Sequence, residues 1–304
     1  MNKHGIVVQQ LASVYKTSGR GIKEATFLVE PGEIMGILGS NGSGKSTLIR
    51  TLAGYQNPTA GWYTIGGYDS RIAEAAVGNE AGIVFETSSY FEDLTGRENI
   101  AFVNKLYKQK AFDEEIVKEL FLSDALDIPM KNYSFGMRRK VDLAEAILRK
   151  PKVLILDEPF TGLDYASKYV VQERLQRLAR EGSAILLTTN EITEAESICD
   201  TVAFVHQGTI INKETVTALL ADIVDLQEID LHLKNFIAIQ KIGEINGVKS
   251  VAVKDGRVRM SAERGALAEI IRGIVDAGGD ICDIRINRAT LADVFLQKTG
   301  IHLQ

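Results

Sequence analysis

A glycine-rich segment at residues 39–46 constrains the fold of this chain more than any other feature. Its sequence, Gly-Ser-Asn-Gly-Ser-Gly-Lys-Ser, matches the pattern G-x-x-x-x-G-K-[ST] at every position. The apolar residues 34–38 predict a strand before it, and the periodic apolar residues up to about Ala53 predict a helix after it, which Gly54 is placed to end. A loop that joins a strand to a helix in this way is the context in which the pattern binds phosphate.

The residue types of this segment suit a nucleotide triphosphate. Glycines leave room for backbone N–H groups around the phosphates, and the start of the following helix adds a partial positive charge. Lys45 supplies a cation, and the hydroxyl of Ser46 supplies a ligand for Mg²⁺. A glycine-rich turn with a chance Lys-Ser pair is the alternative, against which the flanking strand and helix argue. The candidate nucleotide-binding residues here are Gly39, Ser40, Asn41, Gly42, Ser43, Gly44, Lys45, Ser46 and Thr47.

A second candidate element follows the apolar residues 153–156, where Asp157 and Glu158 come directly after a predicted buried strand. Asp157 is suited to hold Mg²⁺ through water, and Glu158 is suited to act as the general base on an attacking water. Acidic residues also commonly mark the ends of strands, but together with the phosphate loop they favour a catalytic pair.

The rest of the first 222 residues indicates an α/β fold. Apolar runs at 62–65, 82–85, 153–156 and 184–188 predict strands that alternate with helical patterns, which favours a largely parallel sheet. Residues from Thr95 to about Lys150 are mostly helical, and Thr95 and Glu98 match a capping box. Asp164 opens a further helix that Gly182 closes.

The length of 304 residues suggests two domains, and the pattern changes after about Ala221. We expect strands at 228–233, 248–253, 257–260 and 281–286, and helices at 236–243 and 266–277. Asp255 and Gly256 match a two-residue hairpin turn, and a final helix holds Leu291, Val294 and Phe295. This βαββαβ order predicts a ferredoxin-like domain.

Composition limits the function classes. The net charge of −5 gives no global basic field for nucleic acid, and no apolar run approaches the ~18 residues of a membrane span. We therefore expect any membrane role to come through a partner. The two cysteines, Cys199 and Cys282, show no metal-type spacing, so they indicate a reducing compartment and are expected in the core.

With these residues in view, the chain resembles an ATP-binding subunit of an ABC transporter. The segment 133–137, Tyr-Ser-Phe-Gly-Met, resembles the family's signature LSGGQ: it keeps Ser134 and Gly136 and departs at three places. Residues 162–164 resemble the D-loop with Asp164, and Tyr15 resembles the aromatic residue that stacks on adenine. This resemblance covers about residues 1–222, and residues 288–300 resemble the extra domain of the drug-exporter and sodium-exporter branch.

The resemblance implies an α/β P-loop NTPase fold with a mixed sheet. It places an ATP-binding domain at residues 1–222, with a helical subdomain at about 88–150, and a small α+β ferredoxin-like accessory domain at 223–304. It also implies ATP and Mg²⁺ as cofactors and a homodimer around two ATP molecules that drives an integral membrane permease. Ser134 and Gly136 would then meet the γ-phosphate held by the opposite subunit. The chain would be cytoplasmic, peripheral on the inner face of the cell membrane, and attached only through the permease, with export as the direction of transport.

Two positions depart from the family pattern. After the strand at 82–85 the family has glutamine, whereas this chain has Glu86, which keeps an oxygen for Mg²⁺ but loses the amide donors and adds negative charge. After the strand at 184–188 the family has a histidine at the γ-phosphate, whereas this chain has Asn190. Its amide donates a hydrogen bond but carries no positive charge and relays no proton.

These departures leave three hypotheses. The favoured one is an active ATPase motor, because Lys45, Ser46, Asp157 and Glu158 are all intact. The second is an ATP-dependent dimerisation switch with little turnover. The third is a soluble ABC ATPase of DNA repair or translation, which the acidic net charge and the lack of sustained heptads or a second cassette argue against; we expect no nucleic-acid partner.

The cations Arg138, Arg139 and Lys140 stand in the first turn of the helix that follows Ser134. They oppose the helix dipole by about 0.3–1 kcal/mol each, which an anion at this helix end would relieve. The simpler interpretation, which we favour for these three residues, is a solvated charged face. Asp164 likewise has a purely structural interpretation, as the N-cap of its helix.

Overall fold

The computed structural model describes residues 5–72, 81–87, 90–106, 114–222, 226–235, 239–254, 257–263, 265–287, 290–291 and 293–294. The chain forms two compact units that divide between Thr215 and Val216. Helix α8 (Val216–Asp222) belongs to the second of these compact units. The domain boundary after residue 222, inferred from the sequence pattern, stays a prediction.

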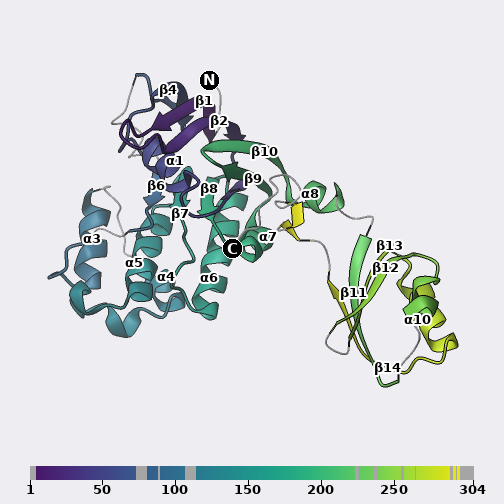
Figure 1. Ribbon diagram of the computed structural model, residues 1–304. Helices are drawn as coiled ribbons and strands as arrows, with labels where there is room; N and C mark the ends of the chain where they lie inside the picture. Colours follow the sequence, from purple (N-terminus) through teal and green to yellow (C-terminus); the bar gives the residue numbers. More distant parts are fainter. Residues whose placement is uncertain are drawn as a thin grey trace. The chain divides into compact units, whose positions relative to one another are not determined.

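The described strands of the N-terminal unit form one sheet in the order β5-β4-β1-β2-β10-β9-β3-β8-β7-β6 (Figure 1). From β9 to β6 all neighbouring strands are parallel, whereas β5, β4, β1 and β2 form an antiparallel group. The sheet is thus mixed. The bounds are β1 (Ile6–Val14), β2 (Gly21–Val29), β3 (Ile34–Leu38), β4 (Ala60–Ile65), β5 (Tyr68–Asp69), β6 (Ala81–Val84), β7 (Val153–Asp157), β8 (Ala184–Thr189), β9 (Thr201–His206) and β10 (Thr209–Thr215).

The central strands are apolar because both of their faces are covered. Every residue of β3, β7 and β8 is buried, as expected for parallel strands with other elements packed on both sides. The strands predicted at 34–38, 62–65, 82–85, 153–156 and 184–188 are confirmed, each to within about two residues at its ends.

Sequence patterning did not identify β1, β2, β9 or β10. In β1 a bulge explains why: the register shifts after Val8, and Gln10 has a φ of 46°. Val8 and Leu11 are buried on either side of the exposed Gln9 and Gln10. The extra residue breaks the simple alternation of buried and exposed positions by which a strand is recognised.

The first helix, α1, lies between the two parts of the sheet (Figure 1). Its residues Leu48, Ile49 and Leu52 belong to one buried apolar cluster that includes residues of both the antiparallel strands and the parallel strands. The helix that follows the glycine-rich loop is therefore held in the centre of the unit. The described helices of this unit are α1 (Lys45–Leu52), α3 (Gly96–Leu106), α4 (Glu114–Glu119), α5 (Phe135–Leu148), α6 (Tyr165–Arg180) and α7 (Ile192–Ile198).

The predicted helical region contains α3, α4 and α5, which Figure 1 shows grouped beside the parallel end of the sheet. Two short 3₁₀ turns, η2 (Ser123–Ala125) and η3 (Met130–Asn132), join α4 to α5. The predicted capping box is confirmed, because the Glu98 carboxylate accepts from the Thr95 N–H at 2.8 Å while the Glu98 N–H donates to the Thr95 hydroxyl at 3.2 Å. Ser88, where this region was predicted to begin, lies outside the described residues.

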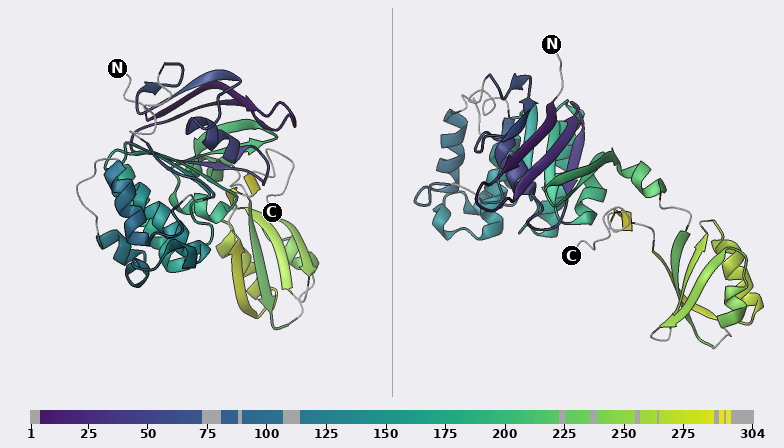
Figure 2. Two further views of the ribbon diagram at one scale, coloured as in Figure 1. Left: turned by 90° about the vertical axis from the view of Figure 1, so that its left-hand side faces the viewer. Right: turned by 45° about the horizontal axis from the view of Figure 1, so that its top comes forward.

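In the second unit a four-stranded antiparallel sheet has the order β12-β13-β11-β14, and α10 lies against one of its faces (Figure 2). This is the ferredoxin-like arrangement that the sequence predicts. Its core is formed by buried residues of the sheet and of both helices, among them Ile229, Ile242 and Ile270. The bounds are β11 (Leu226–Leu233), α9 (Ile239–Gly243), β12 (Val248–Lys254), β13 (Arg257–Glu263), α10 (Leu267–Asp276) and β14 (Ile281–Asn287).

Two of the features predicted for this unit involve residues that the structure does not describe. The predicted hairpin turn at Asp255 and Gly256, and Phe295 of the predicted final helix, lie outside the described residues.

Cys199 of the first unit is buried as expected, but the expectation for Cys282 is wrong: it is exposed near the start of β14, at the edge of the sheet. Among the described residues, no helix combines the length and the apolar character that crossing a bilayer requires.

Because each unit has its own buried apolar core, we expect a chain that ends at Asp222 to fold without the ferredoxin-like sheet. Far-ultraviolet circular dichroism of this truncated chain should show one cooperative thermal transition. A truncated chain without a cooperative transition would contradict the independence of the first unit.

Candidate nucleotide site

The glycine-rich loop runs from the end of β3 to the start of α1, as predicted. Gly44 caps α1 with a φ of 116°, a conformation that other residues rarely adopt, and an added Cβ would lie 2.9 Å from the Ile22 side chain. An added Cβ at Gly39 would lie 2.6 Å from the carbonyl oxygen of Val205. Both glycines are therefore required by the tight path of the loop between β2, β9 and α1.

Lys45 is the first residue of α1 and is only 6% exposed. Its ammonium donates to the carbonyl oxygens of Gly39 at 2.7 Å and Ser40 at 3.3 Å, so it closes the loop on itself. The same ammonium lies 3.4 Å from Glu158 Oε1. Lys45 thus links the phosphate loop to the second predicted element, which stands at the end of a different strand.

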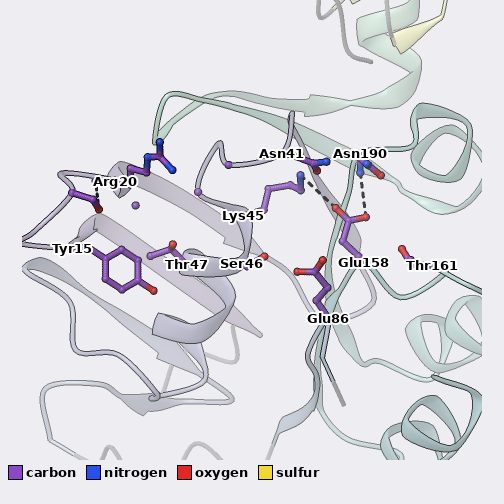
Figure 3. Close-up of a pocket in the computed structure, with 14 residues that line it drawn as sticks. Tyr15, Arg20, Asn41, Lys45, Ser46, Thr47, Glu86, Glu158, Thr161 and Asn190 are labelled. Carbon is purple, nitrogen blue, oxygen red and sulfur yellow. Dashed lines mark hydrogen bonds and ion pairs between the residues drawn. The ribbon is translucent and has the colours of Figure 1, made fainter. Parts of the chain in front are cut away.

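A cavity of about 470 Å³ opens beside this pair. Figure 3 shows Tyr15 and Arg20 on one side of it and Glu158 and Asn190 on the other, with Lys45 between them. The residues that line the cavity are Tyr15, Ser18, Arg20, Gly21, Asn41, Gly42, Gly44, Lys45, Ser46, Thr47, Glu86, Glu158, Thr161 and Asn190.

Four of these lining residues were not predicted: Ser18, Arg20, Gly21 and Thr161. Arg20 reaches the cavity because the chain turns back after Tyr15, where the Gly19 N–H donates to the Tyr15 carbonyl at 2.9 Å and the Tyr15 N–H donates to the Arg20 carbonyl at 2.9 Å. A glycine soon after the aromatic residue is the only signal in the sequence for this turn. Tyr15 itself is 38% exposed and presents its ring to the cavity (Figure 3).

Glu158 follows β7 directly and has a φ of 49°, which is uncommon for a residue with a side chain. Its N–H donates to the carbonyl of Thr188 at 3.1 Å, and its carboxylate accepts from the Asn190 N–H at 3.4 Å. Burial raises the pKa of this carboxyl above its ordinary value, against the opposing effects of Lys45 and of the Asn190 N–H. A carboxylate with a raised pKa is a better proton acceptor.

Asp157 is not among the residues that line the cavity. It is 2% exposed, and its Oδ1 accepts a hydrogen bond from the Thr188 hydroxyl at 2.5 Å. The two departures from the family pattern both line the cavity. Glu86 is exposed just after β6, and Asn190 contacts Glu158 through its main-chain N–H rather than through its side-chain amide.

Of the predicted loop residues, Gly39, Ser40 and Ser43 do not line the cavity. The predicted residues Ser134, Gly136 and Asp164, which belong to other segments, do not line it either. Ser134 is exposed and caps α5, where its hydroxyl accepts from the Met137 N–H at 3.2 Å. Gly136 packs so closely on the D-loop that an added Cβ would lie 2.4 Å from the Gly162 carbonyl oxygen. The structure therefore gives Gly136 a packing requirement of its own.

Asp164 is the N-cap of α6, as its structural interpretation predicts. Its carboxylate accepts from the Ser167 N–H at 2.9 Å and pairs with Lys140 at 3.0 Å. These two donors lower the pKa of Asp164 to about 2, so the group stays ionised over the ordinary pH range.

The expectation of a solvated charged face at the start of α5 is wrong, because each cation has a defined partner. Arg139 is 1% exposed and Lys140 is 8% exposed. Arg138 stacks on the Tyr90 ring at 4.9 Å, also donates to the Tyr90 hydroxyl, and donates to the Lys131 carbonyl at 3.1 Å. The tertiary contacts override the unfavourable position of these charges near a helix N-terminus.

A second cavity, of about 220 Å³, lies between the helical region and β6. Its lining residues are Tyr55, Ile83, Val84, Phe85, Thr87, Val103, Leu106, Asp142, Glu145, Ala146 and Arg149. Burial, with a smaller contribution from Asp142, raises the pKa of Glu145 to about 8. We call this cavity the Tyr55 groove.

Known proteins resemble this chain over most of its length. A sequence profile of the family described as ABC transporter matches residues 22–161. A daunorubicin resistance ATP-binding protein of Streptomyces coeruleorubidus is 32% identical over 281 residues, which are 90% of this chain and 89% of that protein. The ABC transporter ATP-binding protein NatA of Bacillus subtilis is 33% identical over 66% of this chain and 84% of its own length.

Solved structures agree with the fold. An ATP-binding subunit of an ABC transporter has a TM-score of 0.67 and 29% identity, and the match covers 72% of this chain and 92% of that one. A dimeric ATP-binding cassette solved in a post-hydrolysis state with ADP and Pi has a TM-score of 0.63 at 20% identity, and covers 69% of this chain and 98% of that one. Because its sequence identity is only 20%, the second match supports the fold alone.

The raised pKa of Glu145 makes the stability of the protein depend on pH. The unfolded carboxyl ionises near pH 4.5, whereas the folded one stays protonated to about pH 8, so this group destabilises the fold increasingly as the pH rises between these values. We expect Glu145→Gln to raise the unfolding temperature at pH 8 and to leave it unchanged at pH 4.5.

Glu173→Gln, at an exposed position on α6, is the matched control. The measurement is the difference in unfolding temperature between each variant and the wild type across this pH range. A difference for Glu145→Gln that does not grow with pH would contradict the raised pKa.

Proposed function

The chain belongs to the ABC transporter family of ATP-binding proteins, and from that membership we propose that it is the ATPase subunit of an exporter. In this proposal two copies enclose two ATP molecules, and their closure and reopening drive a membrane permease. The observation that carries it is the Lys45–Glu158 pair, which joins a phosphate-binding loop to a candidate general base at 3.4 Å on the wall of one cavity.

The residues of the cavity fit Mg²⁺-ATP. The backbone N–H groups of the loop and the Lys45 ammonium suit the phosphates, and the buried Ser43 hydroxyl, which has no hydrogen-bond partner among the described residues, offers a further donor. Ser46 and Glu86, which line the cavity, offer the hard oxygen ligands that Mg²⁺ prefers, and Asp157, which does not line it, would act through water. When bound, Mg²⁺ would neutralise charge on the phosphates. Tyr15 and Arg20 stand where a base and ribose would extend from the loop.

Glu158 is the proposed general base. Burial keeps its pKa above the ordinary value, so its carboxylate accepts a proton from an attacking water more readily. The strained backbone and the Asn190 N–H hold the carboxylate toward Lys45. This intact arrangement supports the motor over the low-turnover switch, which rests on the departures at Glu86 and Asn190. The names of the relatives support a transporter subunit over an ATPase of DNA repair or translation.

The surface around the starts of α5 and α6 supports dimerisation. Ser134 is exposed and is not among the residues that line the nucleotide cavity, so a γ-phosphate would have to be brought to it by a second copy. Large aromatic side chains are exposed in the first turns of these two helices: Phe135 is 54% exposed, Tyr165 88% and Tyr169 58%. Tyr165 and Tyr169 are one helical turn apart and share a face. Exposed aromatic residues of this kind mark interaction surfaces.

The Tyr55 groove is the proposed docking place for the permease. It lies between the helical region and the strand that leads to Glu86, so an occupant would contact both. Apolar side chains stand open around it, with Tyr55 78% and Leu106 63% exposed, while Glu145 provides a carboxyl for a basic or hydrogen-bonding group. The chain would then sit at the cytoplasmic face of the membrane through the permease.

Export is proposed because relatives carry names of drug resistance. The ferredoxin-like unit is proposed to serve in dimer contact or regulation.

The general-base role of Glu158 predicts that Glu158→Gln lowers steady-state ATP turnover by about 100-fold or more, because general acid–base catalysis contributes about 10²–10⁴-fold. Phosphate release with Mg²⁺ measures this, and the exposed Glu173→Gln should retain wild-type turnover. A wild type that turns over ATP no faster than Glu158→Gln would contradict the ATPase motor and favour the ATP-dependent dimerisation switch.

The docking proposal predicts that a photo-crosslinker at Leu106 labels the co-purifying membrane protein, whereas the same group at Arg180, at the far end of α6, does not. Mass spectrometry of the crosslinked product identifies the partner. Labelling from Arg180 but not from Leu106 would contradict the proposal that the permease binds at the Tyr55 groove.

A further inference from the structure

The largest side chain among the described residues that is almost completely buried belongs to a charged residue, Arg139. It stands on α5, five residues after the cap residue Ser134, and is 1% exposed. Arginine is rarely buried to this degree unless its donors are satisfied. The reason for its burial is therefore to be found in what the guanidinium contacts.

The guanidinium binds main-chain carbonyl oxygens at the ends of two neighbouring strands. Its Nη1 donates to Phe85 at 2.5 Å, and its Nη2 donates to Asp157 at 2.7 Å and to Glu158 at 2.5 Å. The parallel ladder between β6 and β7 ends at Val84, one residue before Phe85. Arg139 thus links the main chains of β6 and β7 at the point where their direct strand pairing ends.

Both segments held in this way carry an acidic residue of the nucleotide cavity. Phe85 directly precedes Glu86, and the third carbonyl is that of Glu158 itself. A hydrogen bond to the carbonyl of Glu158 fixes the peptide plane that follows it, at a residue whose φ of 49° is already strained. The orientation of both carboxylates therefore depends on one guanidinium that does not itself line the cavity.

Charge supports this arrangement. Burial lowers the pKa of Arg139, and the negative charges of Asp142, Asp157, Glu86 and Glu158 offset that effect in part. Hydrogen bonds from a charged donor are about twice as strong as those between neutral groups. Only the planar fork of arginine reaches several acceptors at fixed angles, whereas a lysine ammonium is a point charge on a flexible stem.

We propose that Arg139 is a positioning residue for ATP hydrolysis, which holds Glu158 and Glu86 in their places at the cavity. The proposal rests on the ATPase function proposed above. Because Arg139 stands about 7.5 Å along the same helix from Ser134, a displacement of that helix end moves the guanidinium with it. Arg139, which orients Glu158, therefore belongs to the same rigid helix as Ser134, the residue proposed to contact a second copy.

The test compares full-length variants in steady-state ATP turnover with Mg²⁺ and in equilibrium binding of a fluorescent ATP analogue. We expect Arg139→Met to lower kcat by about 10- to 100-fold, since small misplacements of catalytic groups cost this much. The dissociation constant of the analogue should stay within about threefold, because Lys45 and the loop hold the phosphates independently. Arg139→Lys should retain an intermediate kcat.

The matched control is Arg174→Met, which removes another largely buried arginine. Arg174 is on α6, has a side chain 12% exposed, and pairs with Glu119 at 2.6 Å and with Glu115 at 3.7 Å, partners that belong to α4. We expect this variant to lower the unfolding temperature while kcat stays at the wild-type value.

A folded Arg139→Met with kcat within twofold of the wild type would overturn the proposal. So would a parallel loss of kcat and analogue affinity, which is the signature of general structural damage. If Arg139→Met fails to fold, Arg139→Lys decides by the same two criteria. If Glu158→Gln has a low kcat while the Arg139 variants have the wild-type kcat, only the positioning role of Arg139 is contradicted. If the wild type has a kcat as low as that of Glu158→Gln, both the positioning role and the proposed ATPase function are contradicted.

Discussion

The ion pair between Lys45 and Glu158 is the interaction on which the nucleotide site depends. Lys45 is 6% exposed and Glu158 is 9% exposed, so both charges are held where water screens them little. Burial of one such charge alone would be costly, and each therefore constrains the other. The pair joins the loop after β3 to the end of β7, two strands that pack on either side of β8. Its position thereby brings the phosphate-binding and proton-accepting elements together.

The helix α5 connects that pair to the surface where a second copy is proposed to bind. Its first turns carry three cations with three different roles: Arg138 stacks on Tyr90, Arg139 binds the carbonyls beside the two acidic residues, and Lys140 pairs with Asp164 at 3.0 Å. The helix is thus attached at once to the catalytic strands and to the D-loop. A rigid element attached in this way transmits a displacement rather than absorbing it.

Local sequence patterns predicted the parts of this structure that local interactions determine. The strand at 34–38, the loop and α1 follow from one short motif, and the caps at Thr95 and Asp164 involve residues three positions apart. Arg139 was misread as solvated, because its acceptors lie 18, 19 and 54 residues away. Arg20 and the Tyr55 groove likewise arise from long-range packing. The bulge at Gln10 hid β1, since it shifts the alternation on which recognition relies.

In the proposed mechanism, ATP completes its binding site only between two copies. Sedimentation velocity of Glu158→Gln, with and without Mg²⁺-ATP, tests this most directly, because slow hydrolysis preserves the loaded state. We expect a monomer without nucleotide and a dimer with ATP, and replacement of Ser134 by arginine should abolish the dimer while ATP still binds. A chain that binds ATP tightly yet sediments as a monomer at every concentration would contradict it.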